Sequence, residues 1–335
     1  MKKAIIFRLL IFICMALGII SCSREKKTIR IYDGSWGSIW AANAIAKVII
    51  EDGYGYPVEI KSESEAEMIH ALQNNQLNLC LEMWENVVTG AYDLEGKQVI
   101  FNLGEIYDSG PQFWMIPRWI AEEYGIKSVF DMIDHWQLFR NPENPNKGLF
   151  INGLIIWDSS KINTLKLQAY GLDSYFDEIV PNSSAVEEAA FLRAMKNNQP
   201  VFGYYWAPTY LMGSYDWYIL EEPEYDEEIW NEILSAIEKN DYTSIETACA
   251  YEDRSVNSYA NKEMLKNAPD VIEMLKKMKI DLDVMNELLA WNKQSDHDDW
   301  DQTAIYFFKN YEDLWNKWVT QEAFDNIKMK LMETE

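Results

Sequence analysis

Segments typical of β-strands alternate with segments typical of α-helices along most of the sequence. Residues 28–32 are expected to form a strand, and residues 39–52 a helix, because apolar side chains recur there at the spacing of one helix face. The pattern continues in strands over residues 57–61 and 77–82, which flank a helix over residues 63–74. Such alternation favours mainly parallel sheets that helices cover on both faces. The sequence therefore predicts an α/β fold.

A second alternation covers the middle of the chain, which is long enough for two lobes of ordinary size. Helices are expected over residues 161–170 and 184–197. Further strands are expected over residues 98–103, 111–117, 154–156, 178–181, 200–205 and 217–220. From Glu224 onward the pattern is mostly helical, with Pro269 suited to the first turn of a helix. No short-period repeat or low-complexity linker interrupts the sequence.

Five tryptophans lie at or near predicted strands. Parallel α/β sheets bind ligands beyond the carboxyl ends of their strands, so side chains at those positions are candidates for ligand contact. Aromatic residues make up 14% of the chain, so most of them must serve packing. Packing also remains open for each tryptophan taken alone, whereas five together indicate a shared site. They are Trp36, Trp84, Trp114, Trp157 and Trp206.

Tryptophan faces suit one class of ligand in particular, the quaternary ammonium compounds. Such a cation has no N–H to donate, so ordinary hydrogen bonding does not select it. Each indole face contributes about 0.5–2 kcal/mol of cation–π attraction, and three or four faces could support micromolar binding. A carboxylate at the far end of such a ligand would need backbone N–H groups, as at the turns after Trp36 and Trp157.

Several segments resemble the glycine betaine, choline and proline-betaine substrate-binding family of ABC importers. The resemblance is carried by NSSAVEEA at residues 182–189, YYWAPTY at 204–210 and LEEPEYD at 220–226. Lys161 to Asn163, the strand end at Trp84 and the closing WNKWV at 315–319 match as well. The resemblance spans nearly the whole chain after its N-terminal segment, and the block from Tyr204 to Pro223 is its most specific part.

The resemblance implies a type II periplasmic-binding-protein fold, with the ligand in a cleft between two α/β lobes. The first lobe would comprise residues 28–117 and 217–335, and the second lobe residues 118–216. Ligand binding would close the lobes by a hinge motion, and the permease subunits of the importer would recognise the closed form. The cycle implies neither catalysis nor a cofactor.

The resemblance also implies an aromatic cage formed by Trp36, Trp157 and Trp206. Five further residues are candidates for ligand contact: Trp84, Trp114, Tyr205, Asp158 and Ser159.

One departure from the family bears on the ligand. Residues 155–159 read IIWDS, where the family commonly has Gly-Trp-Gly-Cys. In glycine betaine binders the backbone after that tryptophan receives the ligand carboxylate, and Asp158 would bring a like charge to that place. The departure favours choline or another cationic methylated amine over zwitterionic glycine betaine, unless the Asp158 side chain points away.

The N-terminus has the layout of a bacterial lipoprotein signal. Lys2, Lys3 and Arg8 precede an uncharged run that ends at Ser21-Cys22. We expect residues 1–21 to be a signal peptide, Cys22 to be acylated, and residues 22–27 to form a tether. Two or three acyl chains would hold the protein on a membrane facing the periplasm or cell exterior. A plain signal peptide or a single-pass anchor is the alternative.

Composition bears on whether the protein binds nucleic acid or a metal ion and on whether it holds a disulfide. A net charge of −24 argues against nucleic acid as a partner, because phosphate contacts need Lys and Arg. No His/Cys cluster has metal-ligand spacing, so no metal site is expected. Cys80 and Cys249 could form one disulfide in an exported protein, and the sequence does not show whether they meet.

Three other functions stay open. The same fold could bind a polyamine, an amino acid or another osmolyte, and a surface lipoprotein could use it as an adhesin or sensor. Abundant tryptophans and carboxylates also occur in carbohydrate-active enzymes. Only three histidines are present, and no Gly-x-Ser-x-Gly elbow occurs, so we expect no enzyme.

Overall fold

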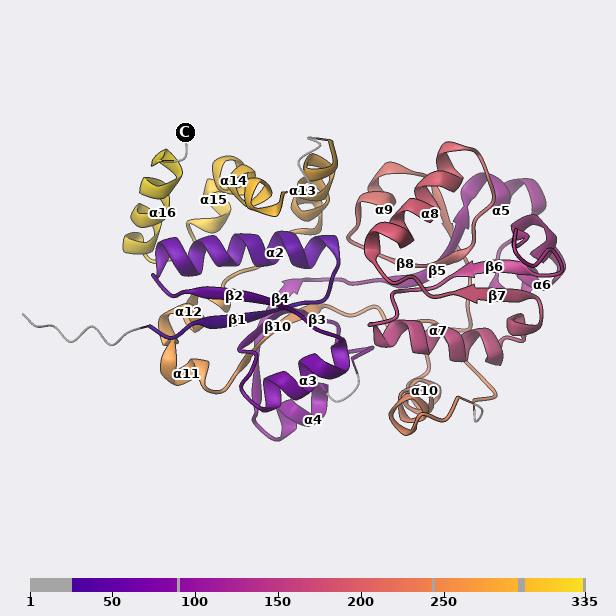
Figure 1. The fold of residues 1–335 in the computed structure, drawn as a ribbon, viewed down its shortest axis with the longest axis horizontal. Helices are drawn as coiled ribbons and strands as arrows, with labels where there is room; N and C mark the ends of the chain where they lie inside the picture. Colours follow the sequence, from indigo (N-terminus) through magenta and orange to yellow (C-terminus); the bar gives the residue numbers. More distant parts are fainter. Residues whose placement is uncertain (1–25, 89–90, 243–244, 295–298, 334–335) are drawn as a thin grey trace, which may run out of the picture.

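The computed structural model describes residues 26–335, apart from residues 89–90, 243–244, 295–298 and 334–335, and it forms two α/β lobes side by side (Figure 1). The first lobe holds a sheet in the order β2-β1-β3-β10-β4, in which β10 is antiparallel to both of its neighbours. Its strands are β1 (Ile29–Asp33), β2 (Val58–Ser62), β3 (Leu79–Met83), β4 (Ile100–Tyr107) and β10 (Val256–Asn261).

The second lobe holds a sheet of the same size, in the order β7-β6-β8-β5-β9. Here β6 is parallel to β7 and β8, and β5 is antiparallel to β8 and β9. The strands are β5 (Gln112–Pro117), β6 (Gly148–Ile151), β7 (Phe176–Ile179), β8 (Gly203–Trp206) and β9 (Trp217–Ile219). The predicted two-lobed α/β fold is confirmed. The sheets are mixed rather than mainly parallel, because β10 in the first sheet and β5 in the second are antiparallel to both of their neighbours.

Helices cover both faces of the first sheet (Figure 1). Helix α2 lies on one face with the C-terminal helices outside it, and α3 and α4 lie on the other. The helices of this lobe are α2 (Gly37–Val48), η1 (Ile49–Gly53), α3 (Glu65–Gln73), α4 (Ala91–Gly96), α11 (Met264–Asn267), α12 (Pro269–Leu275), α13 (Leu282–Gln294), α14 (Trp300–Asn310), α15 (Glu312–Trp315) and α16 (Gln321–Glu333).

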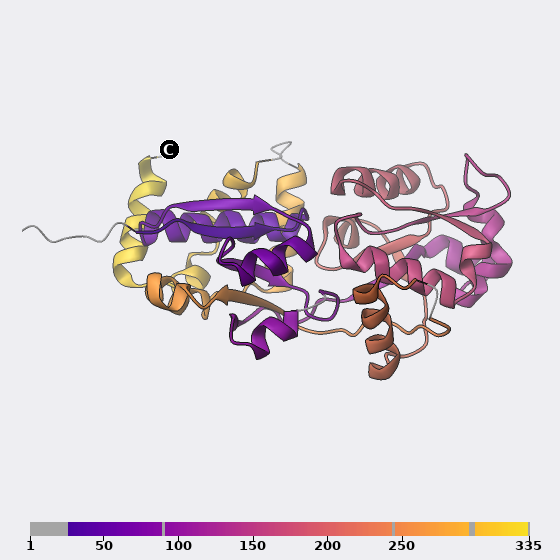
Figure 2. The same ribbon diagram turned by 60° about the horizontal axis from the view of Figure 1, so that its bottom comes forward.

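The second sheet is covered in the same way, and helix α10 packs beneath α7 (Figure 2). The helices of this lobe are α5 (Arg118–Tyr124), η2 (Val129–Asp131), α6 (Met132–His135), η3 (Trp136–Phe139), α7 (Asp158–Ala169), η4 (Leu172–Ser174), α8 (Ser184–Lys196), α9 (Tyr210–Ser214) and α10 (Glu227–Lys239).

The chain changes lobe earlier and returns later than the predicted boundaries. Strand β5 was expected in the first lobe, as part of residues 28–117, but it pairs with β8 and β9 in the second sheet. Strand β9 and helix α10 likewise lie in the second lobe, although residues 217–335 were expected in the first. The boundaries were wrong because backbone partners from distant segments decide which sheet a strand joins.

The strand predicted over residues 154–156 is also wrong. Strand β6 ends at Ile151, and the side chain of Asn152 then accepts a hydrogen bond from the Gly153 N–H at 2.7 Å. Asn152 Nδ2 donates to Ser160 O at 2.8 Å, which holds the turn against the first turn of α7. The apolar run 154–156 is therefore a connection, and Ile155 is 63% exposed. Hydrophobicity alone does not distinguish such a run from a strand.

Cys80 and Cys249 are both buried free thiols. Burial raises the pKa of both, so both are held in the neutral form. Within the described ranges, no group of three or more His, Cys, Asp and Glu side chains could hold a metal ion. No helix in the same part of the chain is long and apolar enough to span a bilayer.

Candidate ligand-binding site

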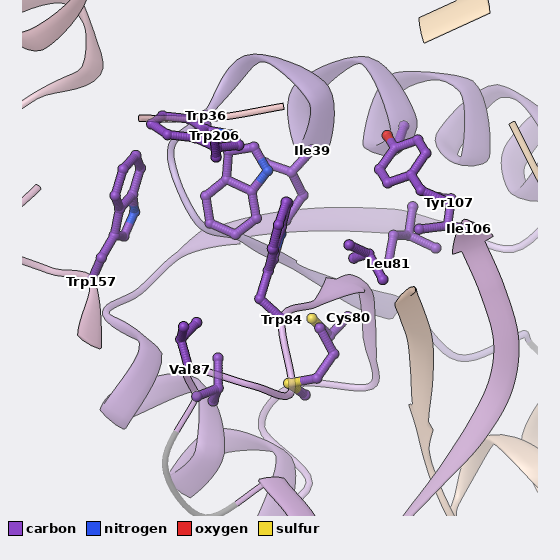
Figure 3. Close-up of a cluster of buried hydrophobic side chains, with 14 of the residues drawn as sticks. Trp36, Ile39, Cys80, Leu81, Trp84, Val87, Ile106, Tyr107, Trp157 and Trp206 are labelled. Atoms are coloured by element: carbon purple, nitrogen blue, oxygen red, sulfur yellow. The ribbon is translucent and has the colours of Figure 1, made fainter. Parts of the chain in front are cut away.

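Four tryptophans converge where the two lobes meet, as Figure 3 shows. The Trp157 ring stands nearly perpendicular to two others: its centroid lies 5.8 Å from that of Trp36 and 4.9 Å from that of Trp206, with interplanar angles of 80° and 89°. The Trp84 side chain, which follows the last residue of β3, points into the same space. All four are at most 7% exposed. We call these four residues the tryptophan cage.

The fold places each cage residue near the end of a strand or at the start of a helix. Trp36 precedes α2 just after β1, and Trp84 follows the last residue of β3. Trp157 is the N-cap of α7, and Trp206 is the last residue of β8. Parallel strands bring their carboxyl ends to one edge of each sheet, and the two edges face each other across the lobes. Strand-end tryptophans far apart in sequence therefore meet in one pocket.

The cavity inside the cage has a volume of about 20 Å³, which is room for about one water molecule. Besides the cage it is lined by Glu65, Val87, Gln112, Ser159 and Tyr204. A quaternary amine would enter only where the rings move apart, and it would then touch several indole faces at once.

The carboxylate of Glu82 holds one side of the cage. Glu82 Oε2 accepts hydrogen bonds from Trp36 Nε1 at 2.6 Å and from Ser38 Oγ at 3.0 Å. Its other oxygen accepts from Tyr107 OH at 2.8 Å. Burial raises the pKa of Glu82 to about 7, although these three donors oppose the rise. Glu82 thus fixes the orientation of the Trp36 ring.

Trp157 ties the two lobes together. Its Nε1 donates to Gly34 O at 2.8 Å, and the Ser184 hydroxyl donates to the neighbouring Ser35 carbonyl. Gly34 also leaves room for the Trp36 ring, since a Cβ atom at position 34 would lie 1.9 Å from that ring. The two lobes are therefore in direct contact around the cage, as in a closed state.

Glu65, which the sequence reasoning missed, is a buried carboxylate on the pocket wall. It is the first residue of α3, and it accepts a hydrogen bond from the backbone N–H of Asp158 across the lobe interface. Burial, together with the nearby charge of Asp158, raises the pKa of Glu65 to about 8, and Lys161 opposes the rise. In the sequence Glu65 looked like an ordinary polar residue at the start of a helix, so nothing there indicated that its side chain would point into the pocket.

Asp158 does not line the pocket, although Ser159 does. The Asp158 side chain is 2% exposed, and its Oδ1 lies 2.5 Å from Lys161 Nζ. Its charge is thus compensated by the next turn of α7. The backbone N–H of Asp158, rather than its carboxylate, faces the Glu65 side chain.

Strand β8 presents Tyr204 to the pocket rather than the predicted Tyr205. Side chains alternate along a strand, so Tyr204 and Trp206 share one face, and their rings stack 6.0 Å apart. Tyr204 OH donates to Gln112 Oε1 at 2.7 Å. Tyr205 instead packs on Phe191, with centroids 5.2 Å apart. The period of the strand was the signal that could have found Tyr204.

The structure places Trp114 in the core of the second lobe, apart from the cage. Its side chain is fully buried, and its ring packs on Phe150 and Tyr170 at 4.7 and 5.6 Å between centroids. Its Nε1 donates to Asn163 Oδ1 at 2.7 Å. Trp114 lies within β5 rather than at its end, which accounts for the packing role.

A second hollow of about 70 Å³ adjoins the cage and shares Trp36 and Trp206 with it. Tyr205, Glu187 and Glu188 also line this hollow. Burial and the neighbouring Glu188 raise the pKa of Glu187 well above its usual range. Glu187 is thus held in its neutral form, and Glu188 is paired at 3.0 Å with Lys293, which lines the same hollow.

Comparison with known proteins gives a family match. Residues 27–310 match the family described as the substrate binding domain of ABC-type glycine betaine transport systems. No curated protein sequence matches the chain significantly.

Several solved structures share the fold. A glycine betaine/L-proline-binding protein, ProX, from Borrelia burgdorferi aligns with 90% of this chain and 99% of its own, at 18% identity and a TM-score of 0.70. An ABC-transporter choline binding protein in complex with choline aligns with 91% of this chain and 98% of its own, at 17% identity and a TM-score of 0.69. Lactococcal OpuAC, closed on glycine betaine, covers 88% and 100%, at 16% identity and a TM-score of 0.64. These similarities establish the fold.

Proposed function

Because the chain belongs to the family of substrate-binding domains of ABC-type glycine betaine transport systems, we propose that its ligand is a quaternary ammonium compound held in the tryptophan cage. Membership of the family makes the protein a substrate-binding component of an ABC importer, and the role is binding rather than catalysis. The observation that carries the choice of ligand is the convergence of four indole rings on one small pocket.

The cage has the chemistry that a methylated ammonium group requires. Four indole contacts at about 0.5–2 kcal/mol each approach the roughly 8 kcal/mol of a micromolar dissociation constant. Structures of the same fold hold choline and glycine betaine, which supports a ligand of that size here. The predicted cage residues Trp36, Trp157 and Trp206, with Trp84 added, would surround the methyl groups.

Lobe closure would complete the site. Trp84 and Trp36 come from the first lobe, and Trp157 and Trp206 from the second, so the cage exists only when the lobes meet. The bond from Trp157 Nε1 to Gly34 O supports such a closed state. The permease subunits would then distinguish the loaded closed form from the open form.

The test is a titration panel on the purified protein. We expect saturable changes in tryptophan fluorescence with choline, glycine betaine, proline betaine or carnitine, and the tightest of these should have a dissociation constant of about micromolar order. Spermidine, whose amines all carry N–H groups, should give no saturable response at comparable concentration.

A neutral control separates the charge of the ligand from its shape. The carbon analogue of choline, in which a tert-butyl group replaces trimethylammonium, should bind about tenfold more weakly or worse, because it lacks the cation–π term. Flat responses to every quaternary amine would exclude the proposed ligand class. Tight spermidine binding would instead favour a polyamine.

The substrate-binding domain acts outside the cytoplasm, and we further propose that Cys22 anchors it to the membrane. Residues 1–25, with the predicted signal peptide and Cys22, lie outside the described residues, so this proposal rests on the sequence. We expect labelled palmitate to be incorporated into the wild-type chain in bacteria and to be lost in Cys22→Ser. Equal labelling of both chains would refute the anchor.

A further inference from the structure

Glu65 brings a protein carboxylate into the wall of the pocket. The side chain is 4% exposed and lines the same space as Trp36, Trp84, Trp157 and Trp206. Two hydrogen bonds hold Glu65 in place, one made by its backbone and one by its carboxylate. The backbone N–H of Glu65 donates to Ile156 O at 3.3 Å, and its Oε2 accepts from the Asp158 N–H.

The Asp158 N–H is the donor to which an anionic ligand group would be drawn. It lies in the first turn of α7, a helix of twelve residues, directly after the cage residue Trp157. Helix N-termini attract negative charge because their first N–H groups lack intrahelical partners. In this protein the donor is already bonded to Glu65, so a ligand carboxylate would meet a protein carboxylate in its place.

The groups that surround Glu65 do not neutralise it. From α7, Asp158 and Lys161 are paired with each other at 2.5 Å. The remaining titratable neighbours are ordinarily neutral, and burial favours their neutral forms further. They are Tyr32 on β1, Cys80 on β3, Tyr204 on β8 and Tyr251. A cation inside the cage would therefore supply the counter-charge.

We propose that Glu65 sets the ligand class, so that the cage accepts quaternary amines of net positive charge, such as choline, and discriminates against amines that carry a carboxylate. The inference deepens the proposed function and rests on it. A cation would be attracted both by the indole faces and by Glu65. A zwitterion would also be attracted by the indole faces, but wherever Glu65 is ionised its carboxylate would be repelled by Glu65, in a pocket where water screens little.

The proposal predicts opposite pH dependences for the two kinds of ligand. Burial raises the pKa of Glu65 to about 8, so the ligand-free protein holds the proton at lower pH. A bound cation favours the ionised carboxylate, so binding releases the proton, and affinity rises with pH up to the pKa of Glu65. A bound carboxylate favours the protonated form, so affinity for glycine betaine falls as pH rises.

The test compares choline with glycine betaine by calorimetry on three proteins. At about pH 8, where Glu65 is substantially ionised, the wild type should bind choline about tenfold or more tightly than glycine betaine. In Glu65→Gln we expect choline affinity to fall about tenfold and glycine betaine affinity to hold or rise. Glu67→Gln is the matched control, because it removes an exposed carboxylate from the same helix while glutamine retains the capping box with Ser64. It should change neither affinity.

Three outcomes would overturn the proposal. The first is equal affinity of the wild type for choline and glycine betaine. The second is a Glu65→Gln variant whose affinity falls equally for both ligands. The third is a ratio of choline affinity to glycine betaine affinity that does not change between about pH 6 and about pH 8. The last measurement needs only the wild type, so it holds if Glu65→Gln does not fold. Absence of all quaternary amine binding would instead refute the proposed function, whereas tight but Glu65-independent binding would leave that function standing.

Discussion

Trp206→Ala and Trp157→Ala are each expected to weaken the binding of a quaternary amine about tenfold or more. Each change removes one indole face from the cage, which is worth about 0.5–2 kcal/mol of cation–π attraction together with the apolar contact of the ring. Trp157→Ala should have the larger effect, because it also removes the Nε1 bond to Gly34 that joins the lobes. Calorimetry is the suitable measurement, since both variants lose part of the fluorescence signal.

The control for this pair is Trp119→Ala. Trp119 lies on α5, is 36% exposed, and does not line the cage pocket. The same chemical change there should leave affinity unaltered. If the two cage variants bind as tightly as Trp119→Ala, the ligand lies elsewhere.

Glu82→Leu is expected to lower both stability and ligand affinity. The change removes the acceptor for Trp36 Nε1, Ser38 Oγ and Tyr107 OH, all buried, and leaves three donors without their partner. Each unsatisfied buried donor costs about 1–3 kcal/mol, so we expect a loss of about 3 kcal/mol or more in the free energy of unfolding. Affinity should fall as well, because nothing then fixes the Trp36 ring.

Urea denaturation of ligand-free protein measures the first effect. Glu82→Gln keeps one acceptor oxygen and should lose clearly less than the leucine variant. Glu59→Leu in the same sheet changes an exposed residue with two surface ion pairs, to Arg30 and Lys61, and should stay within about 0.5 kcal/mol of wild type. Equal losses in Glu82→Leu and Glu59→Leu would show that the hydrogen bonds to Glu82 do not stabilise the fold.

The arrangement of the cage was largely predictable. Trp36 and Trp206 come together in the structure because one follows a strand and the other ends one, and the ends of parallel strands share an edge. Trp157 reaches the same edge although the strand predicted before it is absent, because it caps α7 after the connection that follows β6. Trp84 obeys the same rule. Trp114 does not, because it lies inside β5 with Phe150 and Tyr170 around it.

Residues that depend on pairing between distant segments were not predictable. Gln112 reaches the pocket only because β5 joins the second sheet beside β8. Tyr204, by contrast, was within reach of the sequence, because it lies two residues before Trp206 and so shares its face of β8. Glu65 required knowledge that α3 and α7 meet across the lobe interface.

By itself, the sequence determined the alternating elements, the family and the tryptophans at the strand ends, because these depend on local spacing and on residue types. Only the tertiary structure decided how the charges are distributed in the pocket. Asp158, suspected from its position beside Trp157, is neutralised by Lys161, and Glu65 takes its place at the helix N-terminus. The effect of a carboxylate depends on its burial and on which charges and donors lie within a few ångströms, and these neighbours come from segments about 90 residues away.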